Sequence, residues 1–302
     1  MPIHGLGFIG REYRHLKRYR QITLVLLKYG LGDLVDTIGL RRRLGLTKRA
    51  ESAGKGVPSR LSRWERLRMA LEELGPSFVK LGQIASTRPD MLPHDLCLEL
   101  EKLQDTVKPF GIEQVRQVFQ KELGKPIGDA FRDFQDTPIA SASMAQVHRA
   151  VLPSGEVVAV KIQRPEIETI IKVDLEIMLD LAKLAERHLR DIEAINPAGL
   201  VKEFAKTIRK ELDFTIEASH IERFGRNFKG DPTIHVPKVY RELSTPKVLT
   251  MEFIDGIKVS ELDTLREKGY DLALIANRGA DLLLKQIFEH GFFHADPHPG
   301  NI

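Results

Sequence analysis

Near the C-terminus, three polar residues stand at a spacing that could do chemistry: His294, Asp296 and Asn301. An Asp can accept the proton of an attacking hydroxyl or orient a water, and an Asn five positions later can hold Mg²⁺ between phosphate oxygens. The pattern therefore predicts a phosphoryl-transfer loop with Asp296 as the catalytic residue and Asn301 as the metal ligand. Two alternatives stay open: a solvated polar turn, or a zinc site formed by His294, Asp296 and His298.

A small-residue loop and a lysine-bearing strand form the second chemical feature. The loop comprises Ala140, Ser141, Ala142 and Ser143. A turn at residues 153–156 follows, and residues 157–162 predict the returning strand of a hairpin. Lys161 on this strand could reach the α- and β-phosphates of a nucleotide while backbone N–H groups of the loop surround them. Ala and Ser restrict the backbone more than Gly does, so the phosphate geometry is expected to differ from that of a Gly-rich loop. The alternative is an ordinary edge-strand lysine.

Two long helices are predicted after this strand, over residues 166–190 and residues 197–228, because apolar residues recur at threes and fours. The second helix carries Glu211, Asp213 and Glu217. On one continuous helix Asp213 and Glu217 share a face, whereas Glu211 lies about 160° from Asp213. One of these acids is expected to pair with Lys161, and the alternative is a solvated acidic face.

Residues 247–256 predict a buried strand that runs into a turn at Gly256. This segment is the expected hinge between two lobes, where the backbone from Glu252 to Ile254 would meet the edge of an adenine ring. A helix over residues 272–290 then leads into the loop that contains Asp296.

The N-terminal segment differs in charge from the rest of the chain. Residues 1–60 contain 13 Lys/Arg and 4 acids, which is 13 − 4 = +9, so the remainder carries 4 − 9 = −5. A basic arm suggests an anionic partner, which could be membrane phospholipid, nucleic acid or another protein. Residues 19–40 have the apolar period of an amphipathic helix, weakened at Gly30 and Gly32. That helix could lie in a membrane interface or pack on its own domain.

The chain contains a single cysteine, Cys97, which excludes an internal disulfide and indicates a reducing compartment. Its apolar neighbours predict a buried role. No apolar run approaches the roughly 18 residues of a membrane span, and no signal peptide is visible. The expected location is a bacterial-type cytoplasm, at the cytoplasmic face of a membrane.

Residues 63–130 predict a helical extension with one unusual segment around Lys80, Gly82 and Gln83. Lys80 and Gln83 stand three apart, away from the apolar face, and Gly82 would allow close approach of another backbone. This segment could cover a polar pocket, or it could be an ordinary amphipathic surface helix.

The loop, the Lys161 strand, the acidic helix, the hinge and the HxDxxxxN loop occur in the order found in protein kinases. Three departures narrow the comparison: the Ala-rich loop, Glu211-x-Asp213, and Lys80-x-Gly82-Gln83. With these motifs the chain resembles the UbiB (aarF) family of atypical kinase-like proteins linked to ubiquinone biosynthesis. Its N-terminal LLKYGLGDLVDTIGL also looks like that family's N-terminal region.

The resemblance implies an α+β, protein-kinase-like two-lobed fold with a helical N-terminal extension. The expected parts are an arm (1–62), the helical extension (63–130), a kinase-like N-lobe with the hinge (131–256) and the start of the C-lobe (257–302). The C-lobe would be incomplete in this chain, because no second metal-ligating Asp follows the loop before Ile302. The chain is therefore expected to be a fragment or a degenerate member.

The resemblance also implies roles for particular residues. Lys80 and Gln83 would lie over the active site, with Lys80 meeting Glu211 and Asp213, which would exclude a protein substrate. Lys161 would bind nucleotide, with Glu217 as its preferred partner. The implied activity is that of an ATP- and Mg²⁺-dependent ATPase or small-molecule or lipid kinase supporting ubiquinone biosynthesis. The implied partners are a quinone-pathway lipid or biosynthetic complex and a membrane surface bound through the basic arm. No nucleic acid is expected, and a homodimer is possible.

Two other classes of function stay open. One is a pseudokinase-like scaffold or regulator of a quinone-biosynthetic complex, which would bind nucleotide without turnover. The other is a small-molecule phosphotransferase of the aminoglycoside or choline kinase type, which shares the HxDxxxxN loop but has no Lys-x-Gly-Gln extension.

Overall fold

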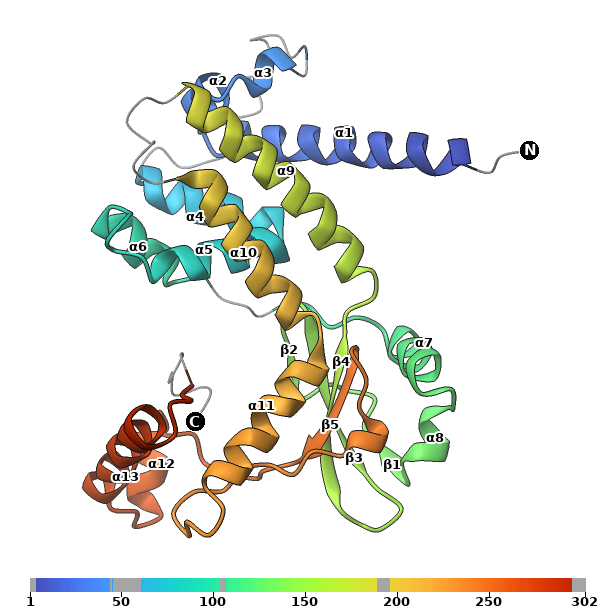
Figure 1. The fold of residues 1–302 in the computed structure, drawn as a ribbon, viewed down its shortest axis with the longest axis vertical. Coiled ribbons are helices and arrows are strands. Elements are labelled where there is room, and N and C mark those ends of the chain that lie inside the picture. The colour runs from blue at the N-terminus through green and yellow to red at the C-terminus, as the bar shows by residue number, and fades with distance from the viewer. Residues whose placement is uncertain (1–3, 44, 46–60, 104–106, 189–195, 295–302) are drawn as a thin grey trace. The chain divides into compact units, whose positions relative to one another are not determined.

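The computed structural model describes residues 4–43, 45, 61–103, 107–188 and 196–294. Within it the chain forms two compact units, each built from segments that are separate in sequence (Figure 1). Unit 1 comprises residues 1–118, 138–146 and 163–212, and unit 2 comprises residues 119–137, 147–162 and 213–302. The boundaries predicted near residues 62, 130 and 256 stay predictions, because these units follow packing rather than chain order.

Unit 1 is mainly helical. Its helices are α1 (His4–Lys28), α2 (Gly32–Thr37), α3 (Leu40–Arg43), α4 (Arg63–Leu74), α5 (Pro76–Ser86), α6 (His94–Leu100), α9 (Ile167–His188), α10 (Pro197–Glu211) and the first part of α7 (Ile112–Leu123). Local sequence explains several of their ends. Ser62 and Glu65 form a reciprocal capping box at the start of α4, and Pro76 and Pro197 occupy first turns.

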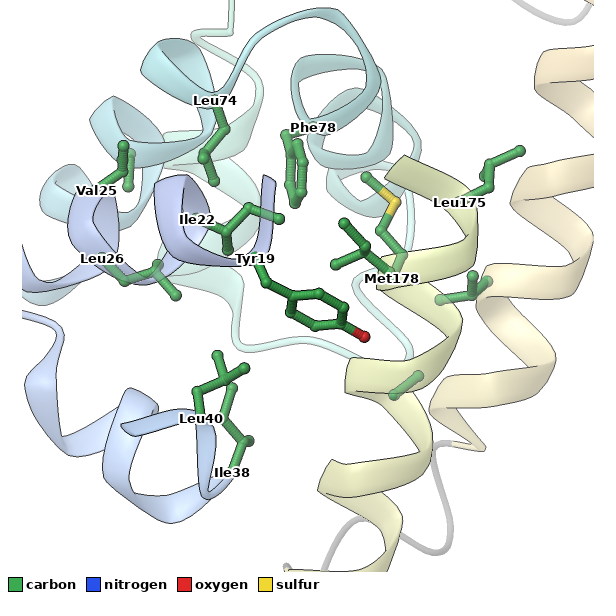
Figure 2. Packing of buried hydrophobic residues seen from close by; sticks show 14 of the residues in the cluster. Tyr19, Ile22, Val25, Leu26, Ile38, Leu40, Leu74, Phe78, Leu175 and Met178 are labelled. Carbon is green, nitrogen blue, oxygen red and sulfur yellow. The ribbon is translucent and has the colours of Figure 1, made fainter. Parts of the chain in front are cut away.

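The apolar face of α1 packs into the core of unit 1. Tyr19, Ile22 and Val25 are buried there together with residues of α4, α5 and α9, among them Phe78 and Met178 (Figure 2). The amphipathic segment predicted as one helix at residues 19–40 is therefore divided among α1, α2 and the start of α3, and its apolar face packs within the protein. Burial of this face accounts for why the helix forms, because packing supplies most of the stability of a helix in a folded protein.

Gly30 ends α1 and separates it from α2. Its φ is +68°, and a Cβ at this position would lie 2.6 Å from Arg66 Nη1. The same guanidinium nitrogen donates to the Gly30 carbonyl at 3.1 Å. Glycine suits this position because it tolerates positive φ and, without a Cβ, leaves space for the guanidinium of Arg66. The predicted weakness of this helix at Gly30 is thus a break into separate helices.

One of the basic residues of the arm turns inward. Arg18 makes an ion pair with Asp174 at 2.7 Å, and the Asp174 side chain has no exposed surface. Arg18 also donates to the Leu74 carbonyl at 2.7 Å, so it joins α1 to α9 and to the end of α4. Its charge therefore belongs to the interior of unit 1 and is not available to an external partner.

Unit 2 contains most of an antiparallel sheet. The strands are β1 (Asp133–Phe134), β3 (Ala145–Val151), β4 (Val157–Gln163) and β5 (Val248–Glu252) in the order β1-β3-β4-β5, and β2 (Ala140–Ser141) pairs with β3 beside this path. The predicted hairpin is β3 and β4, joined by a turn in which the Leu152 amide donates to the Glu156 carbonyl. The predicted hinge strand is β5, which pairs antiparallel with β4.

Helix α11 (Phe214–Asn227) crosses the sheet of unit 2 (Figure 1) and contacts β5. Unit 2 also contains the end of α7 and the helices α8 (Ile127–Ala130), η3 (Arg241–Leu243), α12 (Leu262–Glu267), α13 (Leu272–Leu284) and η4 (Lys285–Glu289). The last two together occupy the helix predicted at residues 272–290. Within the described residues, no helix is long and apolar enough to cross a membrane.

The continuous helix predicted over residues 197–228 is wrong. The structure has α10, a break at Leu212 and Asp213, and then α11. Asp213 is extended, and its carboxylate accepts a hydrogen bond from the Thr215 amide at 2.9 Å. Aspartate is favoured as an N-cap because its side chain satisfies an amide at the start of a helix. The break therefore follows from a local signal that the apolar period concealed.

Candidate functional site

The ammonium of Lys161 is paired with Glu217. Lys161 lies on β4 opposite Leu249 of β5, and its Nζ is 2.7 Å and 3.0 Å from the two carboxylate oxygens of Glu217 on α11. The side chains retain 27% and 39% exposure, so the ammonium is oriented yet open to solvent. The expected pairing of Lys161 with Glu217 is present. Such an oriented cation can bind an anionic ligand, because the carboxylate holds the long side chain in place.

An aromatic ring completes the surroundings of Lys161. Nζ lies 4.8 Å from the ring centroid of Phe214, the first residue of α11. Phe214 is buried, and its amide donates to the Pro246 carbonyl at 3.0 Å. A ring face attracts a cation through its quadrupole. Sequence reasoning missed Phe214, although its position between Asp213 and Glu217 could have drawn attention to it.

Gln163 is a second residue that sequence reasoning missed. It stands two positions after Lys161 on β4, has 3% exposure, and donates from Nε2 to the Leu212 carbonyl at 2.7 Å. Leu212 directly precedes Asp213, the cap of α11. An amide within a buried strand was the available signal, because buried polar groups need a partner.

Asp213 has a different role from the one considered for it. Its Oδ1 accepts from both the amide and the hydroxyl of Thr215, at 2.9 Å and 2.6 Å. It lies outside the helical part of α11 and so does not share a helix face with Glu217. Its position as a cap sets the orientation of α11, which in turn carries Glu217.

The small-residue loop forms a tight turn. The Ala142 amide donates to the Ala145 carbonyl at 2.8 Å, and the Ala142 carbonyl accepts from Arg164 Nη2 at 3.2 Å. The amide of Ala142 is therefore already engaged, contrary to the expectation that it would face a phosphate. Ala140 is exposed, Ser141 is half-buried and Ser143 is buried. The Ser141 Oγ is buried without a hydrogen-bond partner among the described residues, so it could still accept or donate a hydrogen bond.

The hinge strand also uses backbone groups internally. The Glu252 amide donates to the Lys238 carbonyl at 2.8 Å, and the Phe253 amide donates to the Val157 carbonyl at 3.1 Å. The Glu252 carboxylate accepts from the Lys238 amide at 3.1 Å. The amides of Glu252 and Phe253 are therefore engaged within the protein. The expectation that the backbone from Glu252 to Ile254 would meet an adenine edge stays a prediction, and Ile254 keeps 48% exposure.

The Lys80 segment forms α5 and lies within unit 1. Lys80 Nζ is 3.1 Å from a carboxylate oxygen of Glu211, the last residue of α10. Gln83 instead donates to the Leu103 carbonyl at 3.2 Å. At Gly82 an added Cβ would collide with the Leu103 side chain, so the glycine permits close packing of a side chain rather than of a backbone. Lys80 and Glu211 thus meet as expected.

The remaining predicted residues lie outside the described part of the chain: Asp296, His298 and Asn301. His294 is described, and its amide donates to Gln286 Oε1 at 2.8 Å. Across the described ranges, no three His, Cys, Asp or Glu side chains come together as a metal site. The magnesium and zinc predictions are therefore untested. For nucleotide, the residues that fit are Lys161 and Glu217, which offer a held cation to a phosphate.

An antiparallel sheet with a strand lysine paired to a helix glutamate belongs to the kinase-like class of folds. Residues 102–302 match the family described as the ABC1 atypical kinase-like domain. The chain belongs to this family, and its fold is α+β, as predicted.

The chain is similar to proteins named "Probable protein kinase UbiB". It is 43% identical over 290 residues to the one from Pseudomonas fluorescens (strain SBW25), covering 95% of this chain and 54% of the relative. The Pseudomonas aeruginosa (strain LESB58) protein of that name is 43% identical over 294 residues, with the same coverage. The chain thus spans about half the length of the curated relatives it matches. The predicted resemblance to the UbiB family is confirmed.

Among solved structures, the chain is similar to "The complex structure of Rv3197-erythromycin from Mycobacterium tuberculosis". The TM-score is 0.55 with 29% identity, covering 76% of this chain and 58% of the other. This likeness supports the kinase-like fold independently of the sequence motifs.

Proposed function

We propose that the protein is an atypical kinase-like ATP-binding protein, an Mg²⁺-dependent ATPase or small-molecule or lipid kinase that supports ubiquinone biosynthesis. The observation that carries the proposal is the ion pair of Lys161 with Glu217, at 2.7 Å and 3.0 Å. In phosphoryl transfer, a lysine held by a helix glutamate binds the α- and β-phosphates of a nucleotide. Family membership and the likeness to UbiB proteins support the quinone pathway as the context.

In this proposal the chain's residues hold and orient the reactants. Lys161 binds the nucleotide phosphates, and Glu217 keeps its ammonium in position. Asn301 would hold Mg²⁺, and Asp296 would orient the acceptor or take its proton. Bound Mg²⁺–ATP supplies an activated phosphoryl group. Lys80 and Gln83, with Glu211, are proposed to restrict the acceptor to small molecules or water, which is the role that the resemblance to the UbiB family implies.

Binding of Mg²⁺–ATP by calorimetry tests the proposal. Lys161→Ala should weaken the affinity by at least about tenfold, because a charge-assisted contact to phosphate contributes about 1.5–3 kcal/mol. Lys238→Ala is the matched control, since Lys238 is also a unit 2 lysine paired with a glutamate, and it has 62% exposure. Glu217→Gln should fall between wild type and Lys161→Ala. Equal affinity in Lys161→Ala and wild type would refute the proposal.

Turnover separates the enzyme from the scaffold alternative. ATP hydrolysis or transfer that depends on Asp296 supports catalysis, whereas tight nucleotide binding without turnover identifies a pseudokinase-like regulator. For an acceptor, small organic molecules should be assayed beside quinone-pathway lipids. The solved relative described as an erythromycin complex supports including them.

We further propose that α1 contacts an anionic membrane surface through its exposed side. Arg14, Lys17 and Arg20 are exposed there, and Leu16 keeps 60% exposure between them. Basic residues near an anionic leaflet each contribute about 1 kcal/mol. This arrangement favours binding at the headgroups, because the apolar face of α1 is already buried in unit 1.

Vesicle sedimentation tests this partner. Vesicles containing phosphatidylglycerol should retain the protein, and pure phosphatidylcholine should not. Lys17→Glu/Arg20→Glu should reduce retention by at least about tenfold. The control Lys202→Glu/Lys206→Glu changes charge equally on the exposed side of α10. Equal loss in both double variants would show that only net charge matters and would refute a role for α1.

A further inference from the structure

Helix α11 carries an aromatic stripe that continues from Glu217. His220 and Phe224 follow at intervals of three and four, so they lie on one side of the helix with Glu217, and Phe228 is the C-cap residue directly after the helix. The ring of Phe292 lies 5.5 Å from His220 and 5.1 Å from Phe224. His290 packs edge-on against Phe228 at 4.9 Å.

We call these five residues the aromatic bridge: His220, Phe224, Phe228, His290 and Phe292. It joins α11 to the segment that immediately precedes His294, all within unit 2. Offset and edge-on ring pairs at these separations attract one another beyond simple burial. The bridge therefore connects the helix that holds Lys161 in place with the start of the predicted catalytic loop.

Phe292 also contacts a cation. The guanidinium of Arg223, also on α11, lies 3.9 Å from its ring centroid, within the range of a cation–π interaction. The Phe292 amide donates to the Gln286 carbonyl at 3.0 Å. The Gln286 side chain, with 3% exposure, in turn accepts from the His294 amide. The turn before His294 is thus held by the contact of Phe292 with Arg223 and by the hydrogen bonds of Gln286.

A second anchor holds the same segment to the residues after α11. Lys285 Nζ is 2.7 Å from Asp231 Oδ2, and the Asp231 carboxylate also accepts from the amide and hydroxyl of Thr233. The Lys285 hydrogen bond, followed by those from Thr233, holds the pKa of Asp231 well below its usual value. The ion pair persists across neutral pH, so the segment is anchored at two points.

We propose that Phe292 is a positioning residue that places His294, the first residue of the HxDxxxxN motif, relative to α11 and its Glu217. The inference rests on the proposed function of Lys161 and Asp296, and it adds a residue that no motif assigned. Phe292 acts by packing against His220, Arg223 and Phe224 rather than by touching a reactant. A shift of about 1 Å in a catalytic group can cost about a hundredfold in rate, so such packing has a measurable consequence.

Phe293 provides a matched control. It is the next residue, has the same side chain, and keeps 54% exposure. Phe292→Leu and Phe293→Leu therefore change the same chemistry at adjacent positions, and only the first removes a ring from the aromatic bridge. Phe292→Tyr restores a ring and serves as the conservative rescue.

Amide hydrogen exchange tests this packing without any need for activity. Phe292→Leu should speed exchange at residues 286–294 by about tenfold, and Phe293→Leu and Phe292→Tyr should match wild type. If Phe292→Leu also matches wild type, the proposal is overturned. Exchange in the sheet strands should be equal in all variants, which excludes general unfolding.

Turnover tests the consequence for catalysis. In Phe292→Leu, kcat for ATP should fall by at least about tenfold while KM for ATP stays within about threefold, and Phe292→Tyr should recover kcat. If Phe292→Leu instead raises KM for ATP and leaves kcat unchanged, the positioning role is overturned. Absence of nucleotide binding by the wild-type protein would refute the proposed function, and in that case the exchange comparison still decides whether Phe292 positions His294.

Discussion

The two lysine–glutamate pairs differ in their electrostatic surroundings, although their glutamates, Glu211 and Glu217, are close together in sequence. Glu211 is the last residue of α10 and pairs with Lys80 at 3.1 Å. Glu217 lies in the first turn of α11 and pairs with Lys161 at 2.7 Å. The lysines are similarly exposed, at 26% and 27%, so burial does not distinguish them.

The helix dipole does distinguish them. The C-terminal end of a helix carries partial negative charge and disfavours a carboxylate, whereas the N-terminal end favours one. Glu211 therefore depends on Lys80, while Glu217 would be stabilised at its position even without Lys161. The Lys80 pair is expected to contribute to stability, and the Lys161 ammonium is more readily shared with a ligand.

The single tryptophan allows the two settings to be measured separately. Trp64 lies in α4, which belongs to unit 1. Lys80 and Glu211 also belong to unit 1, whereas Lys161 and Glu217 belong to unit 2. Fluorescence of Trp64 during urea unfolding therefore reports on the unit that holds the Lys80 pair.

The buried ion pair of Arg18 with Asp174 should give the largest change in the free energy of unfolding. Arg18→Met should destabilise unit 1 by about 3–5 kcal/mol, because it leaves Asp174, which has no exposed side-chain surface, charged and unpaired. Trp64-monitored urea unfolding measures the effect. Arg20→Met, an exposed position on the same helix, should change little. Equal effects of the two substitutions would contradict the ranking of pairs by burial.

The junction between the two acids should give the next largest effect. Gln163→Leu removes the donor to the partly buried Leu212 carbonyl and leaves that group without this partner, at a cost of about 1–3 kcal/mol. The same fluorescence assay applies, since Gln163 and Leu212 belong to unit 1. Gln117→Leu, on the exposed side of α7, is the control. A neutral Gln163→Leu would show that the start of α11 is set without this bond.

Direct substitution of the two lysines should change the free energy of unfolding by less than the substitutions above. Only the Lys80 substitution is expected to destabilise unit 1. Lys80→Met should destabilise unit 1 by about 0.5–1 kcal/mol, because Glu211 then faces the negative end of α10 alone. Lys161→Met should leave the Trp64 transition unchanged within error. Hydrogen exchange of α11 measures its local effect. A larger loss of stability from Lys161→Met than from Lys80→Met would overturn the dipole argument.

A third pair tests the comparison through pH. The Lys28 hydrogen bond, aided by the Tyr29 hydroxyl, holds the pKa of Glu73 below its usual value. A carboxyl whose folded pKa is lowered stabilises the fold above its ordinary pKa and loses that contribution as pH falls through the folded value. Glu73→Gln should therefore flatten the decline of the Trp64 unfolding midpoint below about pH 4.5. Glu101→Gln, at an exposed position, should leave the decline unchanged.

Tyr29 responds at the opposite end of the pH range. Burial, with the adjacent Glu73, raises the pKa of Tyr29 to about 12. Its protonated form therefore contributes stability that is complete below its ordinary pKa near 10 and is lost as pH rises toward 12. The cluster of Lys28, Tyr29 and Glu73 thus acts from both sides of neutrality, with its contribution largest between the two limits.

Much of the candidate site followed from local patterns. Alternating apolar residues around a Pro/Gly turn indicated the hairpin that carries Lys161. The acids after it indicated that one of them pairs with Lys161, and the resemblance to the UbiB family favoured Glu217. These features are periodic, and a period of two or of 3.6 survives in the sequence whatever the partner element is. The helix break at Asp213 was equally local, but it was hidden because the apolar period runs on across it.

Other features had no local sign. Arg18 is one of several arginines in a basic arm, and nothing in its neighbours separates it from Arg20. Its inward turn depends on Asp174, which lies 156 residues away. Phe292 and Phe293 are likewise indistinguishable as letters, and only the position of α11 makes the first a partner and leaves the second exposed.

The sequence by itself was therefore sufficient for the hairpin of Lys161 and for an acid partner of that lysine, and the resemblance of its motifs to a known family was sufficient for the family, the α+β class and the choice of Glu217. The identity of the residues that hold that pair in place was decided by tertiary structure: Phe214 beneath the ammonium, Gln163 at the junction and Phe292 against α11. The physical reason is the range of the interactions. Capping and amphipathic period act within a few residues, whereas ring stacking and the satisfaction of buried polar groups depend on which distant segments the fold brings into contact.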